Sequence, residues 1–373
     1  MDKKIYLKEL AFIFLKLGIT AFGGPAAHIA MMQQEMVKKR QWISEEHFLD
    51  LIGATNLIPG PNSTEMAIHI GQYKAGWKGL IVAGLCFISP AVMITLIFAW
   101  LYKQYGQLPE VQPFIYGMKP AIISVILAAI YPLAKKSLKS KQLWIIGITV
   151  LILSIVGLNE IFLLFGAGVM SVLLTLINRK QSIQSLIPFT ILQALDSNFI
   201  STKNINLILI FLKIGAILYG SGYVLFAFLN TELVATGLLT RQQLIDAIAV
   251  GQFTPGPVFS SVTFIGYQIN GLSGSILSTI AIFLPSFIFV ALLHPLMKKI
   301  RSSVLLSTFL DAVNVASVAI IIAVCYQMAK DSITDWRALV IILASLIIFK
   351  FDKINSAFIV LGGGLLGYIL FRI

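Results

Sequence analysis

The chain has 373 residues, of which 58% are hydrophobic and only 12% are charged. A soluble domain carries about twice that charged share, so the composition excludes a soluble protein and predicts an all-α polytopic membrane protein. The apolar runs are unbroken rather than alternating, which argues against a β-barrel. The net charge of +12 comes from Lys and Arg residues between these runs. It therefore indicates membrane topology rather than a nucleic-acid partner.

The apolar runs of the first half predict a series of helical pieces. In chain order they span 7–22, 25–37, 44–58, 62–74, 79–102, 113–134, 143–157 and 160–177. The chain starts with a short basic segment followed by an apolar stretch, which is the pattern of a signal peptide. Because Lys16 interrupts that stretch, we expect an uncleaved first helix.

The second half predicts an equivalent series. Its pieces span about 206–221, 223–235, 240–254, 258–269, 274–297, 308–329, 338–350 and 355–371. Between the halves lies an extra apolar piece, SLIPFTILQAL, whose placement the sequence leaves open. We therefore expect a first repeat at 1–180, a linker at 181–205 and a second repeat at 206–373.

The two halves are copies of one unit, with a period of about 195 residues. FLKLGITAFGGP (14–25) matches FLKIGAILYGSG (211–222). SEEHFLDLIGATNLIPGPN (44–62) matches TRQQLIDAIAVGQFTPGPV (240–258). Two such units are expected to pack around a shared centre, as in many secondary transporters.

The loop charges indicate that the two repeats are inverted in the membrane. KKSLKSK (135–141) is strongly basic, whereas its counterpart KDSITDWR (330–337) is mixed. Conversely, KKIR (298–301) is more basic than its counterpart YKQYG (102–106). Basic loops face the cytoplasm, so equivalent loops are expected on opposite sides.

Each half places Pro-Gly-Pro inside an apolar stretch, in LIPGPNS (57–63) and FTPGPVF (253–259). The pieces on either side are too short to cross a hydrocarbon core of roughly 30 Å, so we expect re-entrant or broken helices. Such breaks are tolerated only where protein or a cavity surrounds them. The free N–H groups that start the next helix attract anions. Paired breaks point to a binding site, although turns that serve packing alone are the alternative.

Two lysines occupy the same position of each repeat, Lys16 and Lys213, inside apolar runs. Charged residues within a membrane are expensive and usually functional. We expect each lysine either to pair with a carboxylate or to have a lowered pKa until an anion arrives, and to help to bind that anion. The alternative is that they snorkel and only anchor their helices.

Further ionisable residues in the apolar runs are acids found in both halves and two histidines. They are Glu35 with Glu232, Asp50 with Asp246, His28 and His69. For the acids we expect a structural role near a helix end, and for His69 a packed ring. His28 follows FGGP closely and is the better candidate for a titrating group.

No enzymatic constellation is found in the sequence. There is no Walker loop, which argues against ATP as the direct energy source, and no Cys/His cluster with metal spacing. We therefore expect no catalytic activity, no cofactor and no metal.

The segment FGGPAAHIAMMQQEMVKKRQWISEEHFLDLIGATNLIPGPNSTEMAIHIG (22–71) resembles the signature of the CHR family of chromate ion transporters. The stretch 219–274 is similar to that family's second domain. The resemblance implies a multi-pass protein of a prokaryotic-type inner membrane. It further implies export of chromate, driven by the proton-motive force, and chromate resistance. Sulfate or another oxyanion is an alternative substrate, and a transported cation is a third option. A channel or a membrane scaffold is the alternative to a coupled carrier, and a homodimer is left open.

Combined with the breaks and the charges, this resemblance gives a set of candidate substrate-binding residues. They are Lys16, Gly23, Gly24, Pro25, His28, Asn56, Pro59, Gly60, Pro61, Asn62, Ser63, Glu65, Lys213, Gly220, Ser221, Gly222, Gln252, Pro255, Gly256 and Pro257. The second half departs from the motif, since Val258 and Ser261 stand where the first half has Asn62 and Glu65. We therefore expect unequal roles, with the first-half loop contacting the substrate.

Overall fold

The computed structural model describes residues 3–22, 24–179, 203–219, 222–293, 303–350 and 354–372, all of them helical or connecting segments. The first half contains α1 (Lys3–Thr20), α2 (Gly24–Gln33), the π-helical turn η1 (Gln34–Lys39), α3 (Glu45–Thr55), α4 (Asn62–Tyr105), α5 (Gln112–Ser137), α6 (Lys141–Val156) and α7 (Glu160–Arg179). The expected interruptions at FGGP and at the first Pro-Gly-Pro are confirmed.

The second half repeats this order. It contains α8 (Lys203–Ile217), η3 (Gly222–Val224), α9 (Leu225–Leu229), η4 (Asn230–Val234), α10 (Arg241–Phe253), η5 (Val258–Ser260), α11 (Ser261–Leu293), α13 (Val304–Ser332), α14 (Trp336–Lys350) and α15 (Ser356–Leu370). The piece SLIPFTILQAL and the candidate residues Gly23, Gly220 and Ser221 lie outside the described residues.

Five of the described helices are long and apolar enough to cross a membrane. They lie at Asn62–Tyr105, Gln112–Ser137, Glu160–Ile177, Val258–Leu292 and Val304–Ser332. Large apolar side chains are exposed along them, such as Trp100 and Ile97 on α4. In water this surface would aggregate, whereas lipid covers it at no cost. The chain is therefore an integral, multi-pass membrane protein.

The short helices before the two Pro-Gly-Pro loops start at equivalent polar caps. The Ser44 side chain accepts a hydrogen bond from the His47 N–H at the start of α3. At the start of α10, Thr240 and Gln243 form a reciprocal capping box. These caps satisfy N–H groups that the helix leaves unpaired, so each helix begins at a defined residue.

The continuous helices α4 and α11 are in fact sharply folded. Gly76 has φ +62° and Gly271 has φ +60°, a conformation that glycine adopts without strain. Beyond the first turn, Gly79 packs backbone to backbone against Gly71, and a β-carbon on either glycine would overlap the other. The pieces 62–74 and 79–102 expected from the sequence are therefore two helices that pack side by side.

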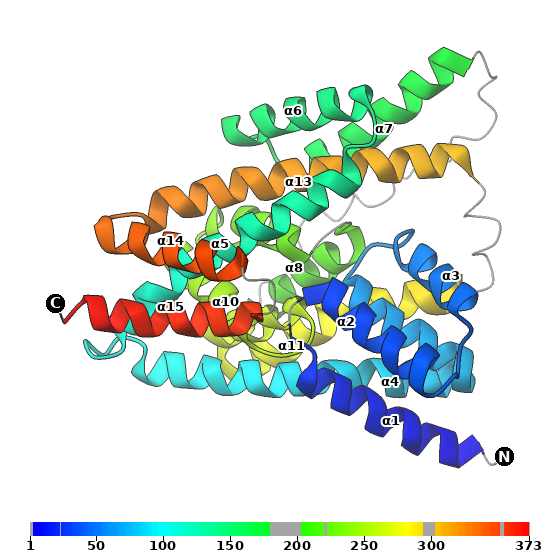
Figure 1. Cartoon of the computed structure of the whole chain (residues 1–373), viewed down its shortest axis with the longest axis horizontal. Coiled ribbons are helices and arrows are strands. Elements are labelled where there is room, and N and C mark those ends of the chain that lie inside the picture. Colours follow the sequence, from blue (N-terminus) through cyan, green and yellow to red (C-terminus); the bar gives the residue numbers. More distant parts are fainter. Residues whose placement is uncertain are drawn as a thin grey trace.

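The halves pack on each other reciprocally. Helix α1 packs on α4, its counterpart α8 packs on α11, and α4 and α11 contact one another. The long α5 packs against α14 and α15 of the other half, just as α13 packs against α6 and α7 (Figure 1). Neither half closes its own core. The inversion of the repeats relative to the membrane, and the domain boundaries given above, stay predictions.

Candidate functional site

The two Pro-Gly-Pro loops, 59–61 and 255–257, are buried and reach into opposite halves. The Gly60 N–H donates to the carbonyl oxygen of Leu218 at 2.8 Å, and the Gly256 N–H donates to that of Ala21 at 2.8 Å. Leu218 and Ala21 are equivalent residues of the repeat, at the ends of the first broken helices. Each loop is therefore anchored on the other half's break, and the breaks and loops form one central region.

Helix α4 begins directly after the first loop, with Pro61 as its N-cap residue. The Pro61 carbonyl accepts hydrogen bonds from the N–H groups of Thr64 and Glu65. The side chains of Ser63 and Thr64 are buried in this turn, and the Thr64 hydroxyl has no hydrogen-bond partner among the described residues. A helix N-terminus with a spare buried hydroxyl is suited to an anion.

Glu65 lies at the centre of this polar turn and is fully buried. The Ser286 hydroxyl of α11 donates to Glu65 Oε1 at 3.4 Å, whereas Oε2 has no hydrogen-bond partner within the described residues. The carboxyl group also packs so closely against Gly60 that a β-carbon there would overlap it. The Tyr219 side chain, just after α8, lies within electrostatic range of Glu65. Both halves thus contribute to one buried polar cluster.

The second loop lacks this cluster. Ser261 stands at the position of Glu65, and Ala91 stands at the position of Ser286. The Ala91 methyl group, rather than a hydroxyl, faces Gly256. Just after this loop, the Thr95 hydroxyl donates a weak hydrogen bond of 3.4 Å to the Ser260 hydroxyl. The two pseudo-equivalent loops are therefore chemically unequal.

Several other candidate residues lie at the edges of the two loops. The Asn62 side chain donates to Asn56 across the first loop at 3.0 Å. Gln252, at the end of α10, is buried, and its Nε2 has no hydrogen-bond partner among the residues described. Gly222 lies near Val258 after the second loop. The four prolines of the two loops, Pro59, Pro61, Pro255 and Pro257, are all buried.

The start of α2 supplies three candidate residues. Gly24, with φ +81°, and Pro25 open the helix. His28 is 1% exposed and its ring stands edge-on to Phe87, with centroids 5.7 Å apart. His28 also lies beside the Ala21 backbone, which receives the second loop. His69 on α4 is fully buried, as expected for a packed ring.

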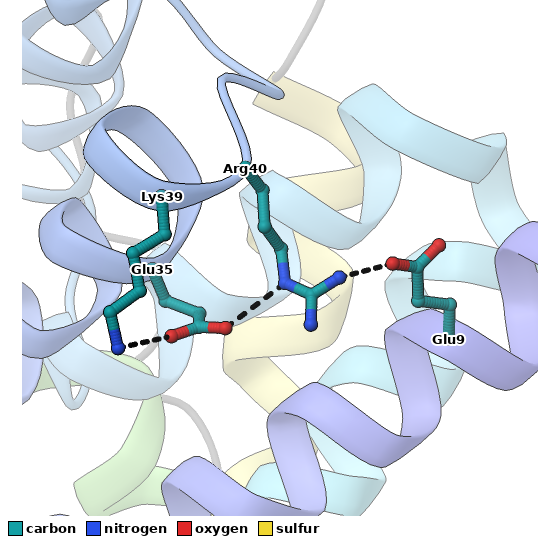
Figure 2. A network of polar contacts seen from close by, with 4 residues as sticks. All are labelled: Glu9, Glu35, Lys39 and Arg40. Carbon is teal, nitrogen blue, oxygen red and sulfur yellow. Dashed lines mark hydrogen bonds and ion pairs between the residues drawn. The ribbon is translucent and has the colours of Figure 1, made fainter.

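Lys16 lies at an exposed position of α1, whereas the polar cluster around Glu65 is buried. It lines a cavity of about 100 Å³ between α1 and the α2–η1 segment, together with Gln34, Glu35 and Lys39. Figure 2 shows the adjoining network, in which Arg40 lies between Glu35 and Glu9 and Lys39 approaches Glu35. Burial acts to raise the pKa of Glu35, but the hydrogen bonds from Arg40 and Lys39 hold it below its ordinary value.

Lys213 has the partner that the sequence analysis expected. Its Nζ lies 2.8 Å from Glu232 Oε1, which is the repeat equivalent of Glu35. The Lys213 side chain is 46% exposed, so this pair is only partly shielded. A role of Lys16 and Lys213 in substrate binding stays a prediction.

Sequence reasoning missed a buried ion pair. Lys119 Nζ of α5 lies 3.2 Å from Asp246 Oδ1 of α10, and the Tyr102 hydroxyl of α4 donates to Asp246 Oδ2 at 2.6 Å. Asp246 lies within α10 rather than near a helix end, where we expected it. The sequence contained a sign of this pair, because Lys119 is a charged residue inside the apolar run 113–134, and such residues are candidates for a functional role. Among the described residues, no three His, Cys, Asp or Glu side chains gather as a metal-binding group.

Together, the crossed Pro-Gly-Pro loops and the buried polar cluster define a helical integral membrane protein of two interlocked repeats. The chromate transporter family model matches residues 8–172 and 205–368, and the chain belongs to that family. No solved structure matches the chain.

Three curated relatives extend over nearly the whole chain. The chromate transport protein of Cupriavidus metallidurans is 32% identical over 98% of this chain and 93% of its own length. The probable chromate transport protein of Synechococcus elongatus is 31% identical, covering 91% of this chain and 89% of the relative. The chromate transport protein of Pseudomonas aeruginosa is 28% identical, covering 96% of this chain and 91% of the relative.

Proposed function

We propose that this protein exports chromate, or a closely related oxyanion, across the plasma membrane as a secondary transporter that draws on the proton-motive force. The observation that carries the proposal is the unequal chemistry of the two loops. The first loop combines a helix N-terminus with the buried polar groups of Thr64, Glu65 and Ser286. The second offers Ser261 and the methyl group of Ala91 in place of the last two. The relatives named as chromate transport proteins support the choice of anion.

In this proposal the oxyanion binds at the start of α4. The free N–H groups of the first turn and the hydroxyls of Ser63, Thr64 and Ser286 donate to its oxygen atoms. Glu65 opposes this binding while it is ionised, because its carboxylate would repel a nearby dianion in an interior where charges are poorly screened. The Glu65 side chain therefore swings away from the helix N-terminus when the anion arrives. While no substrate is bound, the Glu65 carboxyl group occupies the place at the helix N-terminus that the anion takes.

The basic network at η1 forms the approach to this site. Lys38, Lys39 and Arg40 follow one another at the end of the first broken helix. Lys16 and Lys39 line the neighbouring cavity, whose one carboxylate, Glu35, is already paired. A cleft with a surplus of positive charge concentrates anions near its mouth. Since basic segments face the cytoplasm, this placement suits export.

Transport by the purified protein in proteoliposomes tests the proposal. Radiolabelled chromate is trapped inside, and its exchange against external chromate, sulfate, molybdate or phosphate is followed with and without an uncoupler. We expect saturable exchange that chromate supports best, and net movement that responds to the uncoupler. A conductance that does not saturate would favour a channel. No exchange with any of the four anions would contradict the proposal.

A matched pair of variants locates the site. Ser286→Ala removes the hydroxyl at the first loop, while Ser261→Ala removes the hydroxyl that replaces Glu65 at the second. We expect Ser286→Ala to weaken apparent chromate affinity by about tenfold, the value of one lost hydrogen bond to a charged group, and Ser261→Ala to change it by less than about twofold. Equal effects of the two changes would contradict the assignment of the first loop.

A further inference from the structure

Three acidic or basic side chains, histidines aside, are buried among the residues whose side chains the structure describes: Glu65, Lys119 and Asp246. Glu65 belongs to the polar cluster at the first loop. Lys119 and Asp246 are 8% and 3% exposed and face each other from different halves of the chain. A buried ion pair loses more hydration than it regains in attraction unless further hydrogen bonds complete it, so it is weak evidence for stability. A role in transport is the better account of it.

The carboxylate of Asp246 is incompletely satisfied. The Tyr102 hydroxyl donates to Oδ2 at 2.6 Å. Lys119 lies 3.2 Å from Oδ1, yet Oδ1 has no hydrogen-bond partner of good geometry among the residues described. One hydrogen bond and one loose ionic contact are little compensation for a buried charge. The Asp246 carboxylate can therefore be protonated with only a small change in structure.

Among the described residues, no ionisable side chain other than Lys119 and Tyr102 forms a hydrogen bond or ion pair with Asp246. On α5 the remaining lysines, Lys135 and Lys136, are exposed, and Arg241 of α10 pairs with Asp331. Glu232 of η4 pairs with Lys213, and Lys103 of α4 lies over the ring of Tyr267 from α11. Tyr368 of α15 contacts Arg372. The short elements α9 and η5 carry no ionisable side chain. Within the described part of the chain, Lys119 and Tyr102 are therefore the groups that control the charge of Asp246.

The residue types of this network are not repeated in the sequence of the other half. Asp246 corresponds to Asp50, but Lys119 corresponds to Asn314 and Tyr102 to Met297 in the repeat. Since α13 packs on its partner helices as α5 does without these residue types, this mode of packing does not by itself require the network. The network is an addition to one side, and α10, which carries Asp246, leads directly into the second Pro-Gly-Pro loop.

We propose that Asp246, held by Lys119 and Tyr102, is a proton-binding site that takes up a proton when the transporter binds its oxyanion. The inference rests on the proposed function and names the group that links anion and proton. Protonating Asp246 leaves the charge of Lys119 uncompensated in the membrane interior, and this added positive charge stabilises a bound dianion. By thermodynamic reciprocity, a bound dianion favours the proton equally. The proton leaves the cytoplasm together with the dianion, so each cycle exports one net negative charge, and the membrane potential, negative inside, drives this export.

Proton uptake on binding tests the inference directly. Purified protein in weakly buffered detergent solution at alkaline pH, where chromate is a dianion, is mixed with chromate and followed with a pH-sensitive dye. We expect the wild type to take up as much as about one proton per bound anion, and chromate affinity to rise on acidification by at most about tenfold per pH unit. Asp246→Asn should take up no proton at this site and bind with an affinity independent of pH.

Asp311→Asn is the matched control. Asp311 also pairs with a lysine of the other half, Lys139, at 2.7 Å, but this pair is exposed. It should keep the proton uptake and the pH dependence of the wild type. Tyr102→Phe provides a second test should Asp246→Asn fail to fold. It keeps the ion pair and removes one hydrogen bond to the ionised carboxylate, so the pH at which affinity changes should rise.

The outcomes separate this inference from the proposed function. A wild type that exchanges no chromate would overturn the proposed function. A wild type that exchanges chromate but takes up no proton would overturn only the role of Asp246. Proton uptake that persists in Asp246→Asn and disappears in Glu65→Gln would likewise overturn it, because the proton would then belong to the loop cluster. An unshifted pH dependence in Tyr102→Phe would also count against it.

Discussion

Replacing Gly60 with alanine tests whether the close approach of the first loop to Glu65 is needed for transport. Gly60 has φ +131°, which L-residues rarely adopt, and an added β-carbon would lie 2.5 Å from the Ser286 hydroxyl and overlap the Glu65 carboxylate. Backbone strain of this kind costs about 1–3 kcal/mol. The overlap acts in addition, because it displaces the two side chains proposed to frame the anion.

Gly157 is the matched control for the backbone strain alone. It ends α6 with φ +96°, and a β-carbon there would meet nothing within 4 Å. Thermal unfolding of the purified variants should show a loss of about 1–3 kcal/mol for Gly157→Ala, and a larger loss for Gly60→Ala because the overlap adds to the backbone strain. Chromate exchange per inserted protein should fall by about tenfold or more in Gly60→Ala and stay near normal in Gly157→Ala.

Equal transport by the two glycine variants would refute the role given to the first loop. Exchange by Gly60→Ala at the rate of Gly157→Ala, with both proteins inserted, would show that the loop is a packing feature. The start of α4 would then lose its place as the anion site.

Three further predictions concern the surroundings of the site. Lys213→Gln should weaken chromate binding while Lys213→Arg keeps part of it; unchanged affinity in Lys213→Gln would leave the lysine as a helix anchor. The hydrogen bond from Tyr116 lowers the pKa of Asp335 in the α13–α14 connection, so it stabilises the fold above the unfolded-state pKa, and this contribution is lost as pH falls through the folded-state pKa. Tyr116→Phe should accordingly lower the unfolding temperature at neutral pH and not at strongly acidic pH; an equal loss at both would contradict this. Cysteines placed at Lys136 and Lys330 should label from opposite sides of the membrane, and labelling from the same side would refute inverted repeats.

The helices and their interruptions could be predicted from the sequence because the determinants are local. Pro-Gly-Pro cannot continue a helix in either half, and the short apolar runs beside it are too short to span a bilayer. The duplication then fixed which elements correspond. The fold-back of α4 at Gly76 was expected as a boundary between two pieces, although the sequence alone did not show that they pack side by side.

The parts that sequence reasoning missed depend on contacts between distant segments. No local pattern shows that the Gly60 N–H donates to the Leu218 carbonyl oxygen, or that α5 packs against α15 of the other half. For the same reason Glu65 could be singled out as a departure from the repeat, but its partner Ser286 could not. Lys119 and Asp246 were each visible as charges in apolar runs, and only the folded chain shows that they form a pair.

The most direct test of the central claim is to locate the anion. Anomalous scattering from chromium in crystals soaked with chromate would mark its position independently of any assay of transport. The account predicts a peak at the start of α4, within hydrogen-bonding distance of Thr64 and Ser286. A peak only beside Gly256, or only in the cavity at Lys16, would contradict it.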